Sequence, residues 1–168
     1  MSITVSDEQW DALCTDVYRW ATRNRRPGVE PKDVAQEATF RGFRWWKQAG
    51  KSYEEVRAYT FTCAKNWLID ETARAAERAE HERLDEQEVE ELSDDEVDEE
   101  LPRRLLAESA LEKLDEFSRD VIYMHYFLDF QYREIGQVLG EKSSTIRMRA
   151  KRALEKLQRE MGNGDDND

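Results

Sequence analysis

The sequence predicts an all-α protein in which two small helical domains are joined by an acidic linker. The 168 residues include only three prolines and seven glycines, and they lack the β-branched runs from which strands are built. Apolar residues recur instead at three- and four-residue steps, as the buried face of a helix requires. A chain of this length has room for one ordinary domain or two small ones.

The acidic charge gathers in one segment. Residues 80–101 hold 13 acidic residues and one basic residue, so this segment alone accounts for the net charge of −12. So dense a run of like charges favours disorder over an independent fold. We therefore expect domains at 1–79 and 102–161, a linker at 80–101 and an acidic tail at 162–168. The acidic segment could alternatively mimic nucleic acid or dock in the basic groove of a partner.

Three helices are expected in the first domain. The first spans residues 7–25 and ends before a Pro-Gly pair, and the second runs from a proline at its start to a glycine stop, residues 31–50. Ser52 is placed to cap the third helix, with Glu55 completing a capping box. This helix continues, with basic residues, through Arg78.

The second domain is expected to open near Pro102 and to end in a helix-turn-helix. An apolar pattern predicts one helix containing Phe117, Val121, Ile122, Met124 and Leu128. A short amphipathic helix follows at Tyr132–Leu139, Gly140 stops it, and a new helix starts with Ser143 or Ser144 available as its N-cap. This spacing is typical of a helix-turn-helix, whose second helix enters the DNA major groove.

The last helix separates an apolar face from a basic one. Its expected buried stripe consists of Ile146, Ala150, Ala153, Leu154 and Leu157. From Lys142 to Arg159 the chain has seven bases and a single acid, Glu155. A helix that needed only solubility would usually interleave both signs. The pattern therefore favours contact with DNA phosphates and base edges over a plain solvated face.

A second polar stripe follows the third helix of the first domain. Asn66, Asp70, Arg74 and Arg78 stand at four-residue steps, so they share one helical face. Amide, carboxylate and guanidinium groups on one stripe can hydrogen-bond an unstacked base and hold its phosphates. Alternatively, Asn66 and Asp70 form only a local helix pair.

Three stretches, residues 33–46, 56–74 and 114–154, resemble the two conserved domains of bacterial RNA polymerase sigma factors of the sigma-70 family. The resemblance is strongest to the small extracytoplasmic-function (ECF) group, and it covers nearly the whole chain. It implies a transcription initiation factor that recognises promoters. Its expected partners are bacterial core RNA polymerase, promoter DNA and an anti-sigma factor, and the acidic linker is expected to thread a basic polymerase channel. From the residues themselves we expect no enzymatic activity, cofactor or metal.

The resemblance also implies three sets of contact residues. Those that dock on core polymerase are Asp33, Gln36, Glu37 and Phe40. Those for the minus-ten element are Phe61, Lys65, Asn66, Asp70, Arg74 and Arg78, with Asn66 at the pocket for a flipped base. Those for the minus-thirty-five element are Ser144, Arg147, Met148, Arg149, Lys151 and Arg152.

Competing classes of function predict different things. An enzyme is disfavoured because His81 and His125 are isolated and the chain has no glycine-rich phosphate loop. An autonomous helix-turn-helix regulator would bind operators as a dimer without polymerase. An interaction protein that titrates a basic partner would need residues 80–101 and would tolerate loss of Arg147 and Arg152.

The expected location is the cytoplasm. No stretch approaches the roughly 18 consecutive apolar residues of a membrane span, and the start of the chain has no apolar core of a signal peptide. Cys14 and Cys63 lie outside any metal-ligand spacing, so we expect two reduced, buried thiols.

Overall fold

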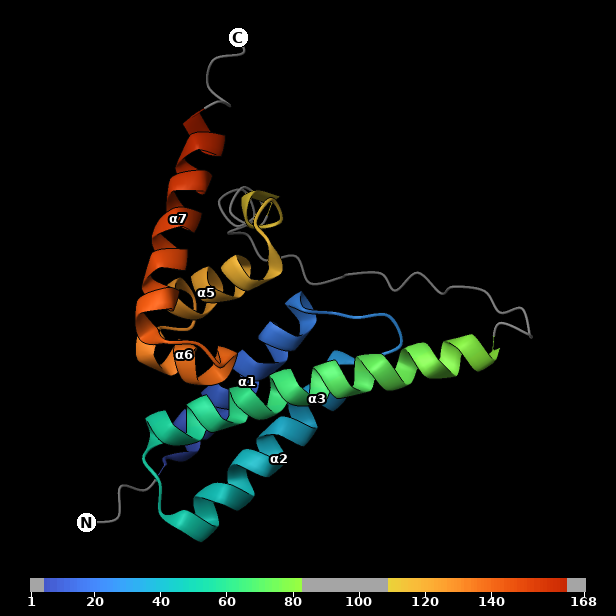
Figure 1. Cartoon of the computed structure of the whole chain (residues 1–168). Coiled ribbons are helices and arrows are strands. Elements are labelled where there is room, and N and C mark those ends of the chain that lie inside the picture. The colour runs from blue at the N-terminus through green and yellow to red at the C-terminus, as the bar shows by residue number, and fades with distance from the viewer. Residues whose placement is uncertain (1–4, 83–108, 163–168) are drawn as a thin grey trace. The chain divides into compact units, whose positions relative to one another are not determined.

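The computed structural model describes residues 5–82 and 109–162, and within them every regular element is a helix. The chain divides into two compact units, the first built on α1, α2 and α3, and the second on α5, α7 and the greater part of α6. The all-α prediction is confirmed (Figure 1). Most of the acidic segment 80–101, the predicted start near Pro102 and most of the tail lie outside the described residues.

The helices of the first unit begin and end where local capping chemistry places them. The helix α1, Asp7–Arg23, starts at a capping box in which Ser6 and Gln9 exchange hydrogen bonds of 3.2 and 3.0 Å. The helix α2, Pro31–Ala49, has a proline in its first turn, and α3 is Tyr53–Glu82.

The capping box predicted before α3 is confirmed. The Ser52 hydroxyl accepts from the Glu55 N–H at 3.3 Å, and the Glu55 carboxylate accepts from the Ser52 N–H at 2.9 Å. These two bonds satisfy donors at the helix start that would otherwise lack intrahelical partners.

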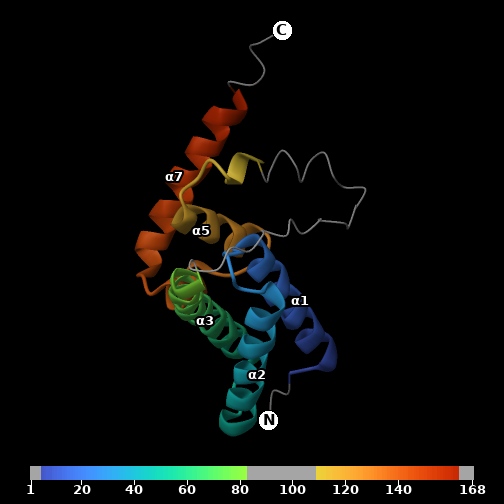
Figure 2. The ribbon, with the colours of Figure 1, turned by 90° about the vertical axis from the view of Figure 1, so that its right-hand side faces the viewer.

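A shared apolar core holds α1, α2 and α3 together, and they lie against one another in two perpendicular views (Figures 1 and 2). The Trp20 ring of α1 meets the Phe61 ring of α3 edge to face at a centroid distance of 6.1 Å. At Gly42 the backbone of α2 approaches α3 so closely that an added Cβ would collide with the Thr60 hydroxyl. The core is made by Leu13, Val17, Trp20, Val34, Ala38, Val56, Phe61 and Ala64.

Only part of the 30-residue helix α3 is packed. Ala75 is the last buried residue, and the side chains from Ala76 to His81 are all exposed. Figure 1 shows this end of α3 continuing past α1 and α2. Arg74 therefore lies near the packed end of the helix, whereas Arg78 lies on the exposed part.

The second unit contains α5, Glu116–Tyr126, α6, Tyr132–Leu139, and α7, Ser143–Gly162. The bounds of α6 and the left-handed Gly140 after it, at φ 72°, are as predicted. The turn into α7 is tight, since the Glu141 N–H donates to the Gly136 carbonyl at 2.9 Å. An added Cβ at Gly136 would lie 2.5 Å from the Glu141 carbonyl oxygen.

Three predicted boundaries differ from the structure. The helix α1 ends at Arg23, two residues early. The helix α5 ends at Tyr126, so Leu128 is buried in the core but lies outside the helix. Ser143 is the first residue of α7, so neither it nor Ser144 occupies the N-cap position.

The remaining sequence expectations concern thiols and membrane spans. Both cysteines are free, and Cys63 is buried, whereas Cys14 is only partly buried. Burial raises the pKa of the Cys63 thiol. Among the described residues, no helix combines the length and the hydropathy needed to span a membrane.

Candidate nucleic-acid interface

The outer face of α7 presents all six residues predicted for the minus-thirty-five element. Their side chains are exposed, whereas Ile146, Ala150 and Ala153 beneath them are buried in the unit. The apolar stripe therefore fixes which face of α7 points outward. Met148 is 54% exposed among the cations, which gives this face one apolar contact group. The exposed residues are Ser144, Arg147, Met148, Arg149, Lys151 and Arg152.

Two arginines of α7 are held by other helices. The Arg149 guanidinium lies 5.0 Å from the centre of the Phe117 ring and 3.9 Å from an Asp115 carboxylate oxygen. The Arg147 guanidinium lies 5.8 Å from the centre of the Tyr132 ring. The sequence analysis did not foresee these contacts, because Asp115, Phe117 and Tyr132 all lie far from the two arginines along the chain.

Asp115 has a second task at the start of α5. It is the N-cap residue, and its carboxylate accepts from the Ser118 N–H at 2.9 Å and from the Ser118 hydroxyl at 2.9 Å. The N–H bond is the main reason why the pKa of Asp115 lies below its ordinary value of 3.8, and Arg149 adds to the shift. The charged form of Asp115 therefore stabilises the helix start and pairs with α7.

On α3 the structure keeps most of the predicted polar stripe and removes one member. Asn66, Asp70, Arg74 and Arg78 are exposed, and Lys65 is half-buried. Phe61, however, is fully buried against Trp20. The prediction that Phe61 lines a path for DNA is therefore wrong, because this ring fills the core between α1 and α3.

The arginines of this stripe share a carboxylate that sequence reasoning missed. Glu71 lies 2.8 Å from an Arg78 nitrogen and 3.4 Å from an Arg74 nitrogen. The hydrogen bond from Arg78 is the main reason why the pKa of Glu71 lies below its ordinary value of 4.5, and Arg74 adds to the shift. Glu71 thus stays ionised and offsets part of the positive charge of both arginines.

The residues predicted to dock on polymerase line one outer face of α2. Asp33, Gln36 and Phe40 are exposed, and Glu37 is partly so. Glu37 pairs with Arg41 at 2.7 Å, and the Arg44 guanidinium lies 5.7 Å from the centre of the Phe40 ring. A large exposed ring framed by charges is typical of a protein-binding face. Arg41 and Arg44 extend this face beyond the residues that the sequence singled out.

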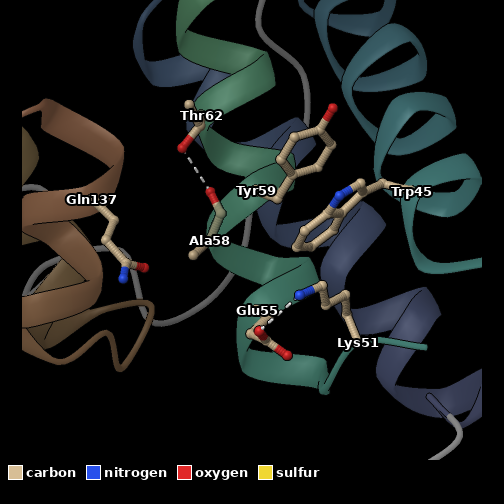
Figure 3. Close-up of a pocket in the computed structure, with 7 residues that line it drawn as sticks. All are labelled: Trp45, Lys51, Glu55, Ala58, Tyr59, Thr62 and Gln137. Atoms are coloured by element: carbon tan, nitrogen blue, oxygen red, sulfur yellow. Dashed lines mark hydrogen bonds and ion pairs between the residues drawn. The ribbon is translucent and has the colours of Figure 1, made fainter. Parts of the chain in front are cut away.

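An aromatic pair joins the end of α2 to the start of α3. Trp45 stacks on Tyr59 with ring centres 4.5 Å apart and planes 23° apart (Figure 3). The Lys51 ammonium lies 5.3 Å from the centre of the Trp45 ring and 3.5 Å from a Glu55 oxygen. Aromatic faces beside a cation can stack an unpaired base and hold its phosphate.

Comparison with known proteins covers both units. The family model for sigma-70 region 2 matches residues 11–78, and the model for sigma-70 region 4 matches residues 110–159. The chain is 31% identical over 157 residues to the ECF RNA polymerase sigma factor SigL of Mycobacterium tuberculosis. The match covers 91% of this chain and 88% of SigL.

Two solved structures share the fold. One is the sigma factor RpoE from Bartonella quintana in complex with the anti-sigma factor NepR, with a TM-score of 0.65 and 16% identity. It matches 90% of this chain and 93% of that one. The other is CnrH in complex with the cytosolic domain of CnrY, with a TM-score of 0.55, 21% identity and coverage of 96% and 93%.

Proposed function

This chain belongs to the extracytoplasmic-function group of bacterial RNA polymerase sigma factors, and from that premise we propose how its two units direct the polymerase to promoters. In this proposal the outer face of α7 reads the minus-thirty-five element, and the polar stripe of α3 contacts the minus-ten element. The exposed face of α2 docks on core polymerase. For the two domains that carry these surfaces we propose the bounds 1–79 and 102–161.

The observation that carries the proposal is the basic outer face of α7. Arg147, Lys151 and Arg152 are exposed on a helix whose apolar stripe packs inward, and this helix follows a tight helix-helix turn. An arginine fork can meet the O6 and N7 of guanine together, which gives about 1–3 kcal/mol of discrimination for each pair. Met148 adds an apolar contact suited to a thymine methyl group.

The minus-ten contacts are proposed to begin at Asn66. Its exposed amide can hydrogen-bond the edge of an unstacked base, while Arg74 and Arg78 hold phosphates of the same strand. The stacked pair Trp45 and Tyr59 supplies an aromatic face in the same unit.

Run-off transcription tests the proposal. Purified bacterial core polymerase is combined with the wild-type chain or with Arg147→Ala/Arg152→Ala, on fragments of the source genome. We expect discrete transcripts that require the chain, and a loss of at least about tenfold in the double variant, because two base-edge contacts disappear. The matched control is Arg19→Ala/Arg25→Ala, which removes the same charge at two exposed positions of the first unit.

Three results would contradict the proposal. The folded chain could fail to bind core polymerase or direct any start, the control could lose as much as the α7 variant, or the α7 variant could keep full activity. A gel shift on the same fragments, with and without core polymerase, separates a sigma factor from an autonomous regulator. Tight duplex binding without core would favour the regulator.

The proposed partners follow the same surfaces. Phe40→Ala should weaken binding to core polymerase and leave the fold intact, because this ring is 56% exposed. The two structural neighbours were solved with an anti-sigma factor and with a cytosolic domain. We therefore propose a cytoplasmic chain, without catalytic activity, that an anti-sigma factor holds inactive.

A further inference from the structure

Three side chains from three helices make a stack that ends on α7. The His125 ring of α5 lies against the Tyr132 ring of α6, with centres 4.3 Å apart and planes 16° apart. The Arg147 guanidinium of α7 lies over the same Tyr132 ring at 5.8 Å. Tyr132 is therefore the shared member of both contacts.

The histidine end of the stack is anchored. The His125 Nδ1 atom lies 2.8 Å from the Phe130 carbonyl oxygen, within hydrogen-bond distance, and Phe130 is itself buried. A second ring, Tyr126, meets His125 edge to face at 4.8 Å. Tyr132 is the first residue of α6, so its backbone is fixed by the helix that precedes the turn into α7. The aromatic ring is thus held on the scaffold before Arg147 meets it.

Arg147, by contrast, is exposed and has no carboxylate partner among the described residues. A free arginine side chain samples many rotamers, and ordering it costs conformational entropy when it binds a base. A guanidinium stacked on an aromatic face keeps its N–H donors in the plane free to hydrogen-bond. The contact with Tyr132 therefore restricts Arg147 without occupying its donors.

We propose that Tyr132 is a positioning residue that holds the Arg147 fork ready for a guanine in the minus-thirty-five element. The inference rests on the proposed function, since it assigns a task to a neighbour of a residue that is proposed to read DNA. Tyr132 acts on base discrimination through Arg147, and it need not touch the base.

The test first locates the base pair that Arg147 reads. Holoenzyme carrying the wild-type chain or Arg147→Ala is assayed on promoters in which each base pair of the minus-thirty-five element is replaced in turn. The base pair at which Arg147→Ala loses discrimination, while the wild-type chain keeps it, is the pair that Arg147 contacts. Discrimination is the ratio of transcription rates on the original and replaced promoters.

Tyr132→Leu is then compared with the wild-type chain. We expect discrimination at the Arg147 pair to fall about two- to fivefold, the range expected for loss of one exposed cation–π contact. Discrimination at the other pairs should stay unchanged. Tyr132→Phe, which keeps the ring, should restore the wild-type ratio, and Tyr132→Leu should cause no further loss in the Arg147→Ala background.

The matched control is Phe127→Leu, which removes a half-exposed ring of the same unit that stacks on Tyr123 instead. Thermal unfolding checks that each variant folds. If Tyr132→Leu fails to fold, Tyr132→Met replaces it, with the same expected loss of discrimination. An unchanged ratio in Tyr132→Leu and Tyr132→Met, or an equal loss at every base pair in them, would overturn the inference and leave the proposed function standing. The absence of any Arg147-dependent pair would overturn both.

Discussion

The two helices proposed to meet DNA treat their positive charges differently. On α3, Arg74 and Arg78 share the Glu71 carboxylate of their own helix. On α7, Arg147, Lys151 and Arg152 have no ion-pair partner among the described residues. These three cations of α7 are thus uncompensated within the described part of the chain, whereas both α3 arginines are partly neutralised by Glu71.

The difference concerns binding more than folding. Ion pairs between exposed side chains contribute little to stability, because water and salt screen them. Each cation that neutralises a phosphate, however, releases counterions and makes binding dependent on salt. An internal carboxylate next to an arginine therefore weakens its attraction for phosphate at little cost to the fold. We infer that α7 supplies most of the long-range attraction and that α3 engages once the chain is already placed.

The largest effects are expected at Gly136 and Gly42, where an added Cβ would disturb the packing of the unit that contains α7 or of the unit that contains α3. Gly136→Ala should destabilise the second unit by about 1–3 kcal/mol, because its Cβ meets a backbone carbonyl that cannot rotate away. Gly42→Ala should destabilise the first unit to a similar degree, because Thr60 would have to give up its 2.7 Å bond to the Val56 carbonyl. Thermal unfolding of both variants measures the losses. Variants that unfold at the same midpoint temperature as the wild-type chain would show that both sites have room for the added methyl group.

A smaller effect is expected at Asp115, the N-cap residue of α5, whose carboxylate lies 3.9 Å from an Arg149 nitrogen on α7. Asp115→Ala should cost about 0.5–2 kcal/mol of stability through loss of the N-cap. Asp115→Asn should retain most of the cap and lose only the charge that faces Arg149. Denaturant unfolding at neutral pH compares the two variants, and equal losses would mean that the charge matters more than the cap.

The same residue predicts a dependence on pH. The folded-state pKa of Asp115 is lowered, chiefly by the Ser118 N–H, so its stabilising effect is present above its ordinary value of 3.8. That effect is lost as the pH falls through the lowered folded-state value. Denaturant titrations of the wild-type chain and Asp115→Asn between neutral and strongly acid pH should therefore converge at the acid end. A constant difference between them would contradict the assignment.

The smallest expected effect sharpens the comparison itself. Glu71→Gln should strengthen promoter binding by holoenzyme a fewfold at low salt and steepen its salt dependence by up to about 1.8 in log–log slope, as two more arginines become available to phosphates. Glu77→Gln makes the same charge change at an exposed site of the same helix. Binding titrations over a range of salt concentrations measure both, and equal effects of the two variants would show that the ion pairs of Glu71 play no part.

Most helices could be predicted from the sequence because their boundaries are set locally. The capping box at Ser52 and the glycine stop at Gly140 depend only on neighbouring residues. The end of α1 was missed because Asn24 is the C-cap residue, with a backbone at φ −97° and ψ 26° that departs from the helix, and the next N–H, of Arg25, donates to the Thr22 carbonyl at 3.4 Å. The end of α5 was missed because Leu128 enters the core from outside the helix, which periodicity cannot distinguish from a further helical turn.

The candidate site divides in the same way. Periodicity identified the outward residues of α7 because a clear apolar stripe lies opposite them. The family resemblance placed Phe61 beside DNA, but Trp20 from another helix buries that ring. Neither signal pointed to Glu71, because its pair with Arg78, seven residues away, forms only when long side chains take particular rotamers. Contacts between helices and between rotamers are therefore what the sequence alone could not supply.

Because only part of α3 is packed, the backbone hydrogen bonds of its two parts should open at different rates. Up to Ala75 its amide hydrogens can exchange with solvent only when the three-helix core opens. From Ala76 to His81 the backbone relies on the intrinsic helix preference of an alanine-rich sequence. Hydrogen–deuterium exchange should consequently show a steep boundary within one uninterrupted helix, with Arg74 on the slowly exchanging side and Arg78 on the fast one.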